Sequence, residues 1–202
     1  MINIKNELLE LGEQIHKKRR LILPKLQLHL ENYLSKLGMK NAKFSINLSK
    51  TSQINSNGID QLDFLFRANK GSNYGKISKV ASGGERSRIM LALKAILSDY
   101  SNLPTIIFDE IDTGVSGEVA NTVGTILQKM AENMQVIAIT HLPQIAAKGQ
   151  QHYKVYKVTH DNDTKTLLKL LSPDERISEL AEMLGGQKIA ESAILHAKAL
   201  LQ

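Results

Sequence analysis

The chain has 202 residues, of which 42% are hydrophobic and 23% charged, a balance typical of a folded domain and not of a disordered segment. It contains no cysteine, which excludes a disulfide scaffold, a thiolate zinc site and a cysteine nucleophile. The formal net charge of +6 favours a polyanionic partner only mildly. No apolar run approaches the roughly 20 residues that span a bilayer, and the charged N-terminal segment lacks the apolar region of a secretory signal. A cytoplasmic protein without a membrane partner is expected.

Residues 1–40 are expected to form a helical arm. Apolar residues recur at helical spacing between Leu8 and Ile22, and Pro24 suits the first turn of a second helix, whose apolar stripe runs from Leu26 to Leu37. The narrow first stripe fits the end of a coiled coil, and an amphipathic helical hairpin fits equally well. The basic run at residues 16–20 is interpreted either as a solvated helix face or as a contact to DNA phosphates.

Residues 41–202 are expected to form one lobe of α/β class. Alternation from Phe44 to Leu48 predicts a strand, a turn follows at 56–58, and a second strand begins at Leu62. Later segments alternate between helix and strand, which favours a mainly parallel sheet flanked by helices. The elements expected there are a helix after residue 85, a strand at 105–108, a helix at 119–130, a strand at 135–140, two strands near 152–158 and 166–171, and helices at 176–184 and 189–201.

Ser82, Gly83, Gly84 and Glu85 open the helix that is expected to bury Ile89, Met90, Leu93, Ile96 and Leu97. Ser82 and Glu85 have the spacing of a capping box, which is a purely structural interpretation. The two glycines also leave backbone N–H groups bare at a helix N-terminus, and such groups bind phosphate. The motif therefore predicts a helix cap that can also hold an anion.

Acidic residues and a histidine follow two apolar strands. Asp109 and Glu110 end the segment TIIFDE, and His141 follows QVIAIT. Because ligands bind at the carboxyl ends of strands in open α/β sheets, Asp109 is a candidate Mg²⁺ ligand and Glu110 a candidate base for an attacking water. His141 is a candidate phosphate contact at the same edge. The alternative is a strand that runs into an ordinary acidic turn.

The segment from Gly71 to Lys76 superficially resembles a Walker A loop. It has three residues between its glycines where that loop needs four, Ile77 where a serine or threonine is needed, and no helix is expected after it. No other stretch fits better, so the chain is expected to lack a phosphate cradle of its own.

The order SGGE, helix, FDE, helix, apolar strand and TH resembles the second half of an ABC-type ATPase head. The strings KVASGGERSRIMLALKAIL, TIIFDEIDTGVSGEVA, VIAITHLPQIAA and ELAEMLGG resemble the C-terminal half of the RecN family of bacterial SMC-like DNA repair proteins. The resemblance covers roughly residue 20 to the end. It implies a P-loop NTPase head at the base of a coiled coil, acting with ATP and Mg²⁺ in the recombinational repair of DNA damage, in a nucleoid-associated bacterial protein.

The resemblance also implies roles for individual residues. Ser82, Gly83, Gly84 and Glu85 would form the signature motif on the ATP held by an opposite head, Asp109 would serve Mg²⁺, Glu110 would activate water, and His141 would sense the γ-phosphate. The segment from Asp112 to Gly117 would be the loop at the head–head contact, although Ser116 stands where many ABC proteins have aspartate. The implied partners are the Walker A half of the same protein, a second head and the ends of double-stranded DNA. No residue is assigned to DNA binding.

This chain alone is expected to be half an ATPase, inactive without the Walker A half. One alternative is a head fragment that binds DNA or a subunit without hydrolysis. A second alternative is the nucleotide-binding domain of an ABC transporter, against which the arm and the string DEIDTGVSG argue.

Overall fold

The computed structural model describes residues 2–100, 103–160, 163–186 and 190–202. The chain divides into two compact units, Met1–Leu97 and Ser98–Gln202, each of which is considered by itself. Within the described ranges, no helix is both long and apolar enough to cross a membrane.

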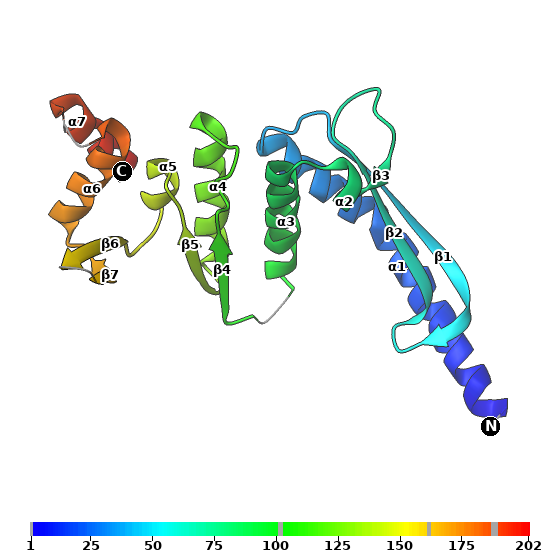
Figure 1. Ribbon diagram of the computed structural model, residues 1–202. Coiled ribbons are helices and arrows are strands. Elements are labelled where there is room, and N and C mark those ends of the chain that lie inside the picture. The colour runs from blue at the N-terminus through cyan, green and yellow to red at the C-terminus, as the bar shows by residue number, and fades with distance from the viewer. Residues whose placement is uncertain (1, 101–102, 161–162, 187–189) are drawn as a thin grey trace. The chain divides into compact units, whose positions relative to one another are not determined.

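The first unit packs one long helix against an antiparallel sheet (Figure 1). Strands β1 and β2 pair in register from Lys43 opposite Arg67, and β3 extends the sheet from β2. The predicted hairpin and its turn at 56–58 are confirmed. The elements are α1 (Ile2–Lys36), β1 (Lys43–Asn55), β2 (Gly58–Arg67), β3 (Gly75–Lys76), α2 (Ile77–Val80) and α3 (Gly83–Ser98).

The prediction of two helices separated at Pro24 is wrong, because α1 runs without a break through this residue. A proline inside a helix removes one backbone hydrogen bond and clashes with the preceding turn, at a cost of about 3 kcal/mol. Contacts to the sheet hold the helix on both sides of the proline. Before it, His16 and Arg19 contact Asp60 of β2; after it, Glu31 accepts from Lys43 and from the backbone N–H of Phe44. A helical hairpin is thereby excluded.

The core of the first unit lies between the second half of α1 and the β1–β2 hairpin. Leu30 and Leu34 on the helix and Leu37 just after it are fully buried, as are Phe44 on β1 and Phe66 on β2. The two phenylalanine rings lie 5.2 Å apart between centroids. The apolar stripe predicted for the second half of the arm is therefore a core face that packs on a sheet.

Helix α3 begins at the predicted position, but its buried face differs from the expected one. Ile89 and Ile96 are buried as predicted, together with Leu91 and Ala92, whereas Met90 and Leu97 are each 53% exposed. The segment before α3 holds a second difference. Residues Ile77–Val80 form a one-turn helix, so the expectation that no helix follows Lys76 is wrong. The spacing argument against a Walker A loop is unchanged, because it depends on the residues alone.

The second unit contains a parallel βαβ arrangement. Strands β4 (Thr105–Asp109) and β5 (Gln135–Ile139) pair in parallel, joined by helix α4 (Gly117–Met130). Phe108 is buried on one face of β4, while its neighbour Ile107 on the other face is 64% exposed. Among the described residues, the predicted parallel sheet is found only as this pair, since the remaining strands pair antiparallel.

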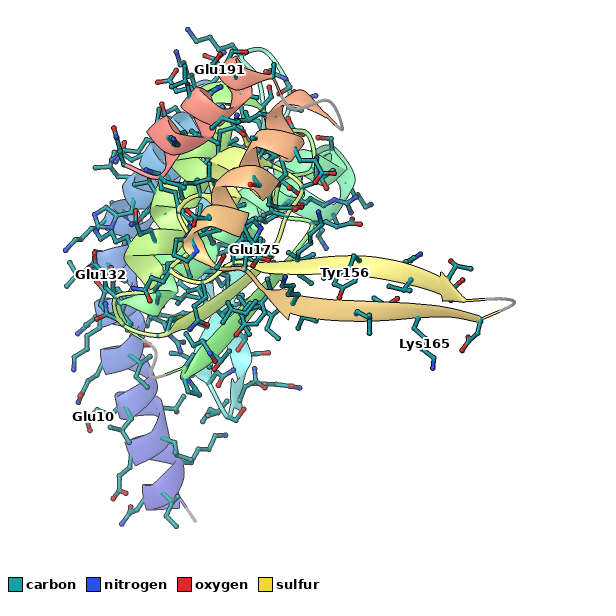
Figure 2. All side chains as sticks on the ribbon, turned by 90° about the vertical axis from the view of Figure 1, so that its left-hand side faces the viewer. Glu10, Glu132, Tyr156, Lys165, Glu175 and Glu191 are labelled. Atoms are coloured by element: carbon teal, nitrogen blue, oxygen red, sulfur yellow. The ribbon has the colours of Figure 1, made fainter. Side chains whose placement is uncertain are left out.

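The rest of the second unit, as far as its residues are described, is a hairpin and three helices. Strands β6 (Tyr153–His160) and β7 (Asp163–Leu170) form an antiparallel ribbon that extends away from α6, with Tyr156 and Lys165 along it (Figure 2). At its base, Lys154 forms ion pairs with Glu179 and Glu182 of helix α6 (Pro173–Gly185). The hydrogen bond from Lys169 lowers the pKa of Glu175, also on α6, to about 2.

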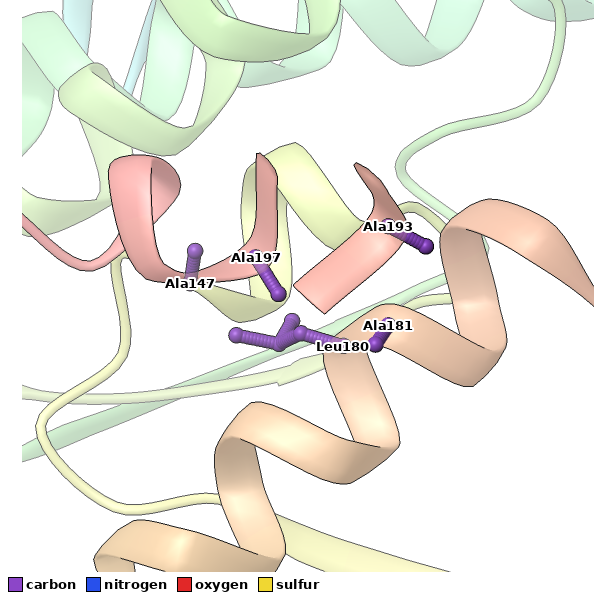
Figure 3. Close-up of a cluster of buried hydrophobic side chains, with 5 residues drawn as sticks. All are labelled: Ala147, Leu180, Ala181, Ala193 and Ala197. Carbon is purple, nitrogen blue, oxygen red and sulfur yellow. The ribbon is translucent and has the colours of Figure 1, made fainter. Parts of the chain in front are cut away.

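A small alanine-rich core fixes the C-terminal helices to one another. Leu180 and Ala181 of α6 pack with Ala193 and Ala197 of α7 (Glu191–Leu200) and with Ala147, which follows α5 (Pro143–Ala146) (Figure 3). Because alanine side chains are short, the helix backbones can approach closely. The segment that follows β5 is thereby held against α6 and α7.

Candidate functional site

The two predicted carboxylates lie where β4 ends. Asp109 is the last residue of the strand, and both Asp109 and Glu110 are exposed. Glu110 has a φ of +51°, the only positive φ of a non-glycine residue among those described. A side chain with a Cβ atom is disfavoured there by roughly 1–2 kcal/mol. Thr113 holds the turn, because its backbone N–H and its hydroxyl both donate to the carbonyl oxygen of Glu110, at 3.2 and 3.0 Å.

Strain of this kind is retained where the surrounding structure or function requires it. The backbone at Glu110 turns sharply out of the strand, so that the side chains of Asp109 and Glu110 do not simply alternate along an extended chain. The strained position therefore marks Glu110 as a candidate functional residue.

A buried carboxylate connects the loop after β4 to the loop after β5. Asp112 is only 2% exposed. One of its oxygens, Oδ2, accepts hydrogen bonds from the Thr140 hydroxyl at 2.6 Å and from the backbone N–H of His141 at 2.8 Å. The Nδ1 atom of His141 lies 3.0 Å from the same oxygen. Burial disfavours the charged form of Asp112, but the hydrogen bonds from Thr140 and His141 outweigh burial and lower its pKa.

His141 is otherwise open to solvent, since its side chain is 76% exposed. Asp109 ends β4, and Glu110 and His141 lie just beyond the ends of the paired strands β4 and β5, as the sequence predicted. Sequence reasoning did not find the contacts of Asp112 and Thr140. Their positions just beyond two paired strands indicated the edge of the sheet, but not that these two residues contact each other.

The signature-like motif in the first unit forms a capping box. The Ser82 backbone N–H and hydroxyl both donate to the Glu85 carboxylate, at 2.8 and 2.9 Å, and the Glu85 N–H donates to the Ser82 hydroxyl oxygen at 3.4 Å. The structural interpretation of Ser82 and Glu85 is therefore confirmed. The Glu85 carboxylate is engaged in the cap, which defines its role in the described structure.

Gly83 has no structural reason to be glycine. Its φ is not in the left-handed region, and a Cβ atom built there would meet nothing within 4 Å. Space is thus left open at the first turn of α3, which is a 16-residue helix with its positive dipole end at this point. Ser82, Gly83 and Gly84 belong to the first unit, and the carboxylates and His141 belong to the second.

The segment from Glu110 to the first residue of α4 depends on glycine at two positions. Gly114 and Gly117 have φ values of +73° and +54°, which other residues adopt only with strain. Ser116 precedes the first residue of α4 and makes no side-chain capping hydrogen bond. The glycines of DTGVSG are accordingly required by the backbone of this loop.

The basic run at residues 16–20 is divided between two uses. Arg19 donates to Asp60 at 2.8 Å, and His16 contacts the same carboxylate, which is 3% exposed. Burial disfavours the charge on Asp60, but its hydrogen bonds to His16 and Arg19 outweigh burial and lower its pKa. Lys17, Lys18 and Arg20 are exposed. Two residues of the run thus serve to attach α1 to the sheet.

No group of three or more possible metal ligands occurs among the described residues. This is compatible with Mg²⁺ held at a nucleotide, because that ion is commonly bound by one or two carboxylates together with phosphate oxygens and water. Asp109 supplies an exposed carboxylate of the right chemistry at the strand end.

Curated relatives of the chain are DNA repair proteins named RecN. The chain is 43% identical to RecN of Haemophilus influenzae over 169 residues, which is 83% of this chain and 30% of the relative. It is 41% identical to RecN of Rickettsia bellii over 198 residues, which is 98% of this chain and 36% of the relative. The chain belongs to the RecN family. It spans about a third of the length of these RecN proteins, and no family model matches it.

Solved structures show that this RecN-family chain has the fold of an SMC head. The Smc head domain of Pyrococcus yayanosii, solved with a coiled coil and joint, matches with a TM-score of 0.60 and 18% identity, over 89% of this chain and 34% of that one. A chain solved in work on ATP-driven dimerisation and DNA-stimulated activation of SMC ATPases matches with a TM-score of 0.54 and 18% identity, over 85% of this chain and 99% of that one. The predicted fold class is thereby confirmed.

Proposed function

We propose that this chain supplies one half of an ATP-hydrolysing head that acts in the repair of DNA double-strand breaks. The observation that supports this most strongly is the edge formed by Asp109, Glu110 and His141, where the loops after β4 and β5 are joined through Asp112. The Walker A loop would come from the part of a RecN protein that this chain does not span. Hydrolysis then requires both parts.

The carboxylates would have separate roles in this head. Asp109 would hold Mg²⁺, which when bound neutralises phosphate charge and orients the phosphates. Glu110 would orient an attacking water and accept its proton on a carboxylate oxygen. Its exposed position and its turn out of the strand support this role, because the carboxylate must reach a solvent molecule. His141 would donate or accept a hydrogen bond at the terminal phosphate through its exposed ring.

Ser82, Gly83 and Gly84 would bind the phosphates of a nucleotide that lies on an opposite head. The open space at Gly83 supports this assignment, since neither backbone conformation nor packing requires glycine at that position. The capping box would keep the first turn of α3 rigid, so that its N–H donors are preorganised for an anion. ATP between two heads would then join a second copy of the head to the first.

An exposed apolar surface in the second unit supports the proposal that another protein segment covers this chain. On one face of the β4–β5 pair, Ile107, Ile137 and Ile139 are 64%, 42% and 55% exposed. Parallel strands are normally covered on both faces. We assign the Walker A half as the partner that covers this face, because the chain spans only 30–36% of the relatives that it matches.

DNA would be the substrate on which the complete protein acts, since the relatives are named DNA repair proteins, and we propose that it acts at double-stranded ends. The exposed Lys17, Lys18 and Arg20 on α1 offer a cationic surface for phosphates. A fragment that binds DNA or the partner half without hydrolysis is the second candidate, favoured by the absence of a Walker A sequence from the chain.

The proposal is tested by measuring ATP hydrolysis by this chain alone, and after it is mixed with the remaining part of a RecN protein produced separately. We expect turnover only in the mixture, and loss of turnover with Glu110→Gln. Glu132→Gln is the matched control, because it removes an exposed carboxylate from the turn after α4. Full turnover with Glu110→Gln would disprove the role of Glu110. Association of the two parts without turnover would favour the binding fragment.

A further inference from the structure

The side chain of His141 is exposed, yet one of its ring nitrogens faces a buried carboxylate. Asp112 Oδ2 lies 3.0 Å from His141 Nδ1 and 2.8 Å from the backbone nitrogen of the same residue. The same oxygen accepts from the Thr140 hydroxyl, and the Thr140 oxygen in turn accepts from the backbone N–H of Leu142 at 3.0 Å. Three consecutive residues after β5 are thus organised by one carboxylate from the loop after β4.

We propose that Asp112 is a positioning residue that holds His141 as the tautomer protonated on Nδ1, with Nε2 left free as an acceptor at the exposed side of the ring. A carboxylate oxygen can only accept, so its position 3.0 Å from Nδ1 favours the ring form that carries the proton on that nitrogen. In a neutral imidazole the other nitrogen is then unprotonated. The role of that nitrogen toward a nucleotide rests on the proposed function, whereas the tautomer does not.

The position of Asp112 makes it a link between the two predicted catalytic residues. It lies two residues after Glu110, and Thr113, the next residue, donates twice to the Glu110 carbonyl. One loop therefore carries both the carboxylate that contacts His141 and the residue that holds the turn at Glu110. Burial of Asp112 at 2% exposure leaves it few alternative partners, which keeps this arrangement specific.

A purely structural role for Asp112 would leave the tautomer of His141 free to vary. In that case the hydrogen bonds from Thr140 and from the His141 backbone would hold the loops together, and the imidazole would behave as an exposed side chain. The two roles are separated by a measurement on the ring itself.

The test uses nitrogen NMR of the chain with ¹⁵N-labelled histidine at about pH 8, above the usual histidine pKa near 6.5. His141→Gln identifies the His141 signals. We expect His141 to be protonated mainly on Nδ1 in the unaltered chain. In Asp112→Ala we expect the ring to change to mainly Nε2 protonation, while the exposed His196 stays unchanged as an internal reference.

Two further variants keep the test decisive if Asp112→Ala does not fold. Asp112→Asn keeps the shape but loses the charge, and we expect the ratio of Nδ1-protonated to Nε2-protonated ring to fall by about tenfold, because a charged acceptor binds a donor more strongly than a neutral one. Thr140→Val removes a hydroxyl that donates to the same oxygen, and we expect it to lower stability while the tautomer is kept. A mainly Nε2-protonated ring in the unaltered chain, or an unchanged ratio in Asp112→Asn, would overturn the proposal.

The ATPase assay of the completed head separates this proposal from the proposed function. Loss of turnover in Asp112→Asn together with the tautomer change supports both. The tautomer change without turnover in any variant, the unaltered protein included, supports the positioning of the ring and disproves hydrolysis. Normal turnover in a folded Asp112→Asn that shows the tautomer change overturns the catalytic relevance of the positioning.

Discussion

Replacing Glu110 by glycine and by alanine isolates the backbone strain at this residue, because both variants lose the same carboxylate. Alanine retains a Cβ atom at the φ of +51°, whereas glycine has none. At a compatible position alanine is favoured over glycine by about 0.4–1 kcal/mol through the entropy of the unfolded chain, and at positive φ the steric cost reverses this order. The steric cost to alanine is roughly 1–2 kcal/mol. After the entropy term is subtracted, the glycine variant is expected to have the higher free energy of unfolding, by about 1 kcal/mol.

The measurement is urea unfolding followed by far-ultraviolet circular dichroism, with thermal unfolding as a second readout. We expect Glu110→Gly to be more stable than Glu110→Ala by about 1 kcal/mol, which is about 4 °C in the midpoint temperature. Glu118, an exposed residue in the first turn of α4, is the matched control. There the order is reversed, with alanine more stable than glycine by about 0.5–1 kcal/mol. Equal or greater stability of Glu110→Ala would refute the assignment of a left-handed backbone to Glu110.

Three other expectations concern the two units separately. Asp60→Ala removes the buried acceptor of His16 and Arg19 and should destabilise the first unit by about 2 kcal/mol in denaturant titrations. Because the pKa of Asp60 is lowered in the folded chain, its contribution is complete above the ordinary carboxyl pKa and is lost as the pH falls through the folded value, so wild type and variant should converge in acid. Leu180→Ala, at a fully buried position, should lower the free energy of unfolding by about 2–5 kcal/mol. Leu195→Ala, at a position that is 64% exposed, should change it by less than about 0.5 kcal/mol. Similar losses in the two variants would contradict the described core. Gly83→Ala should leave the thermal midpoint of the chain unchanged or slightly raised and should abolish turnover of the completed head, so normal turnover would exclude a phosphate contact at Gly83.

Local patterns predicted those parts of the fold that depend on neighbouring residues. The alternation around Phe44 and Ile46 predicted β1, and the apolar run TIIF predicted β4, since both sets of residues are sorted by the faces of a sheet. Pro24 misled the prediction because the contacts that keep α1 continuous come from β1 and β2, which no local rule contains. Met90 and Leu97 lie on the same helix as the buried Ile89, and only the surrounding elements decide which face of α3 is covered.

The sequence predicted which residues lie at the candidate site, but not the hydrogen bonds that join its two loops. Asp109, Glu110 and His141 follow apolar strands, so their common edge could be inferred from the sequence. The contacts of Asp112 could not, because a carboxylate in a loop gives no sign of whether it is solvated or buried. Its 2% exposure follows from the pairing of β4 with β5, which brings Thr140 and His141 beside it.

Because α1 is continuous through Pro24, a label on this helix can report the orientation of the first unit. Over 35 residues an α-helix is about 52 Å long at 1.5 Å per residue. Its exposed residues before Glu13 belong to the same continuous helix whose later turns are held by ion pairs to β1 and β2. A spin label or fluorophore at one of these positions would therefore move with the β1–β2 sheet. Moving the label along the helix by one residue turns its direction by about 100°, so a small set of positions would resolve both the tilt and the rotation of the first unit.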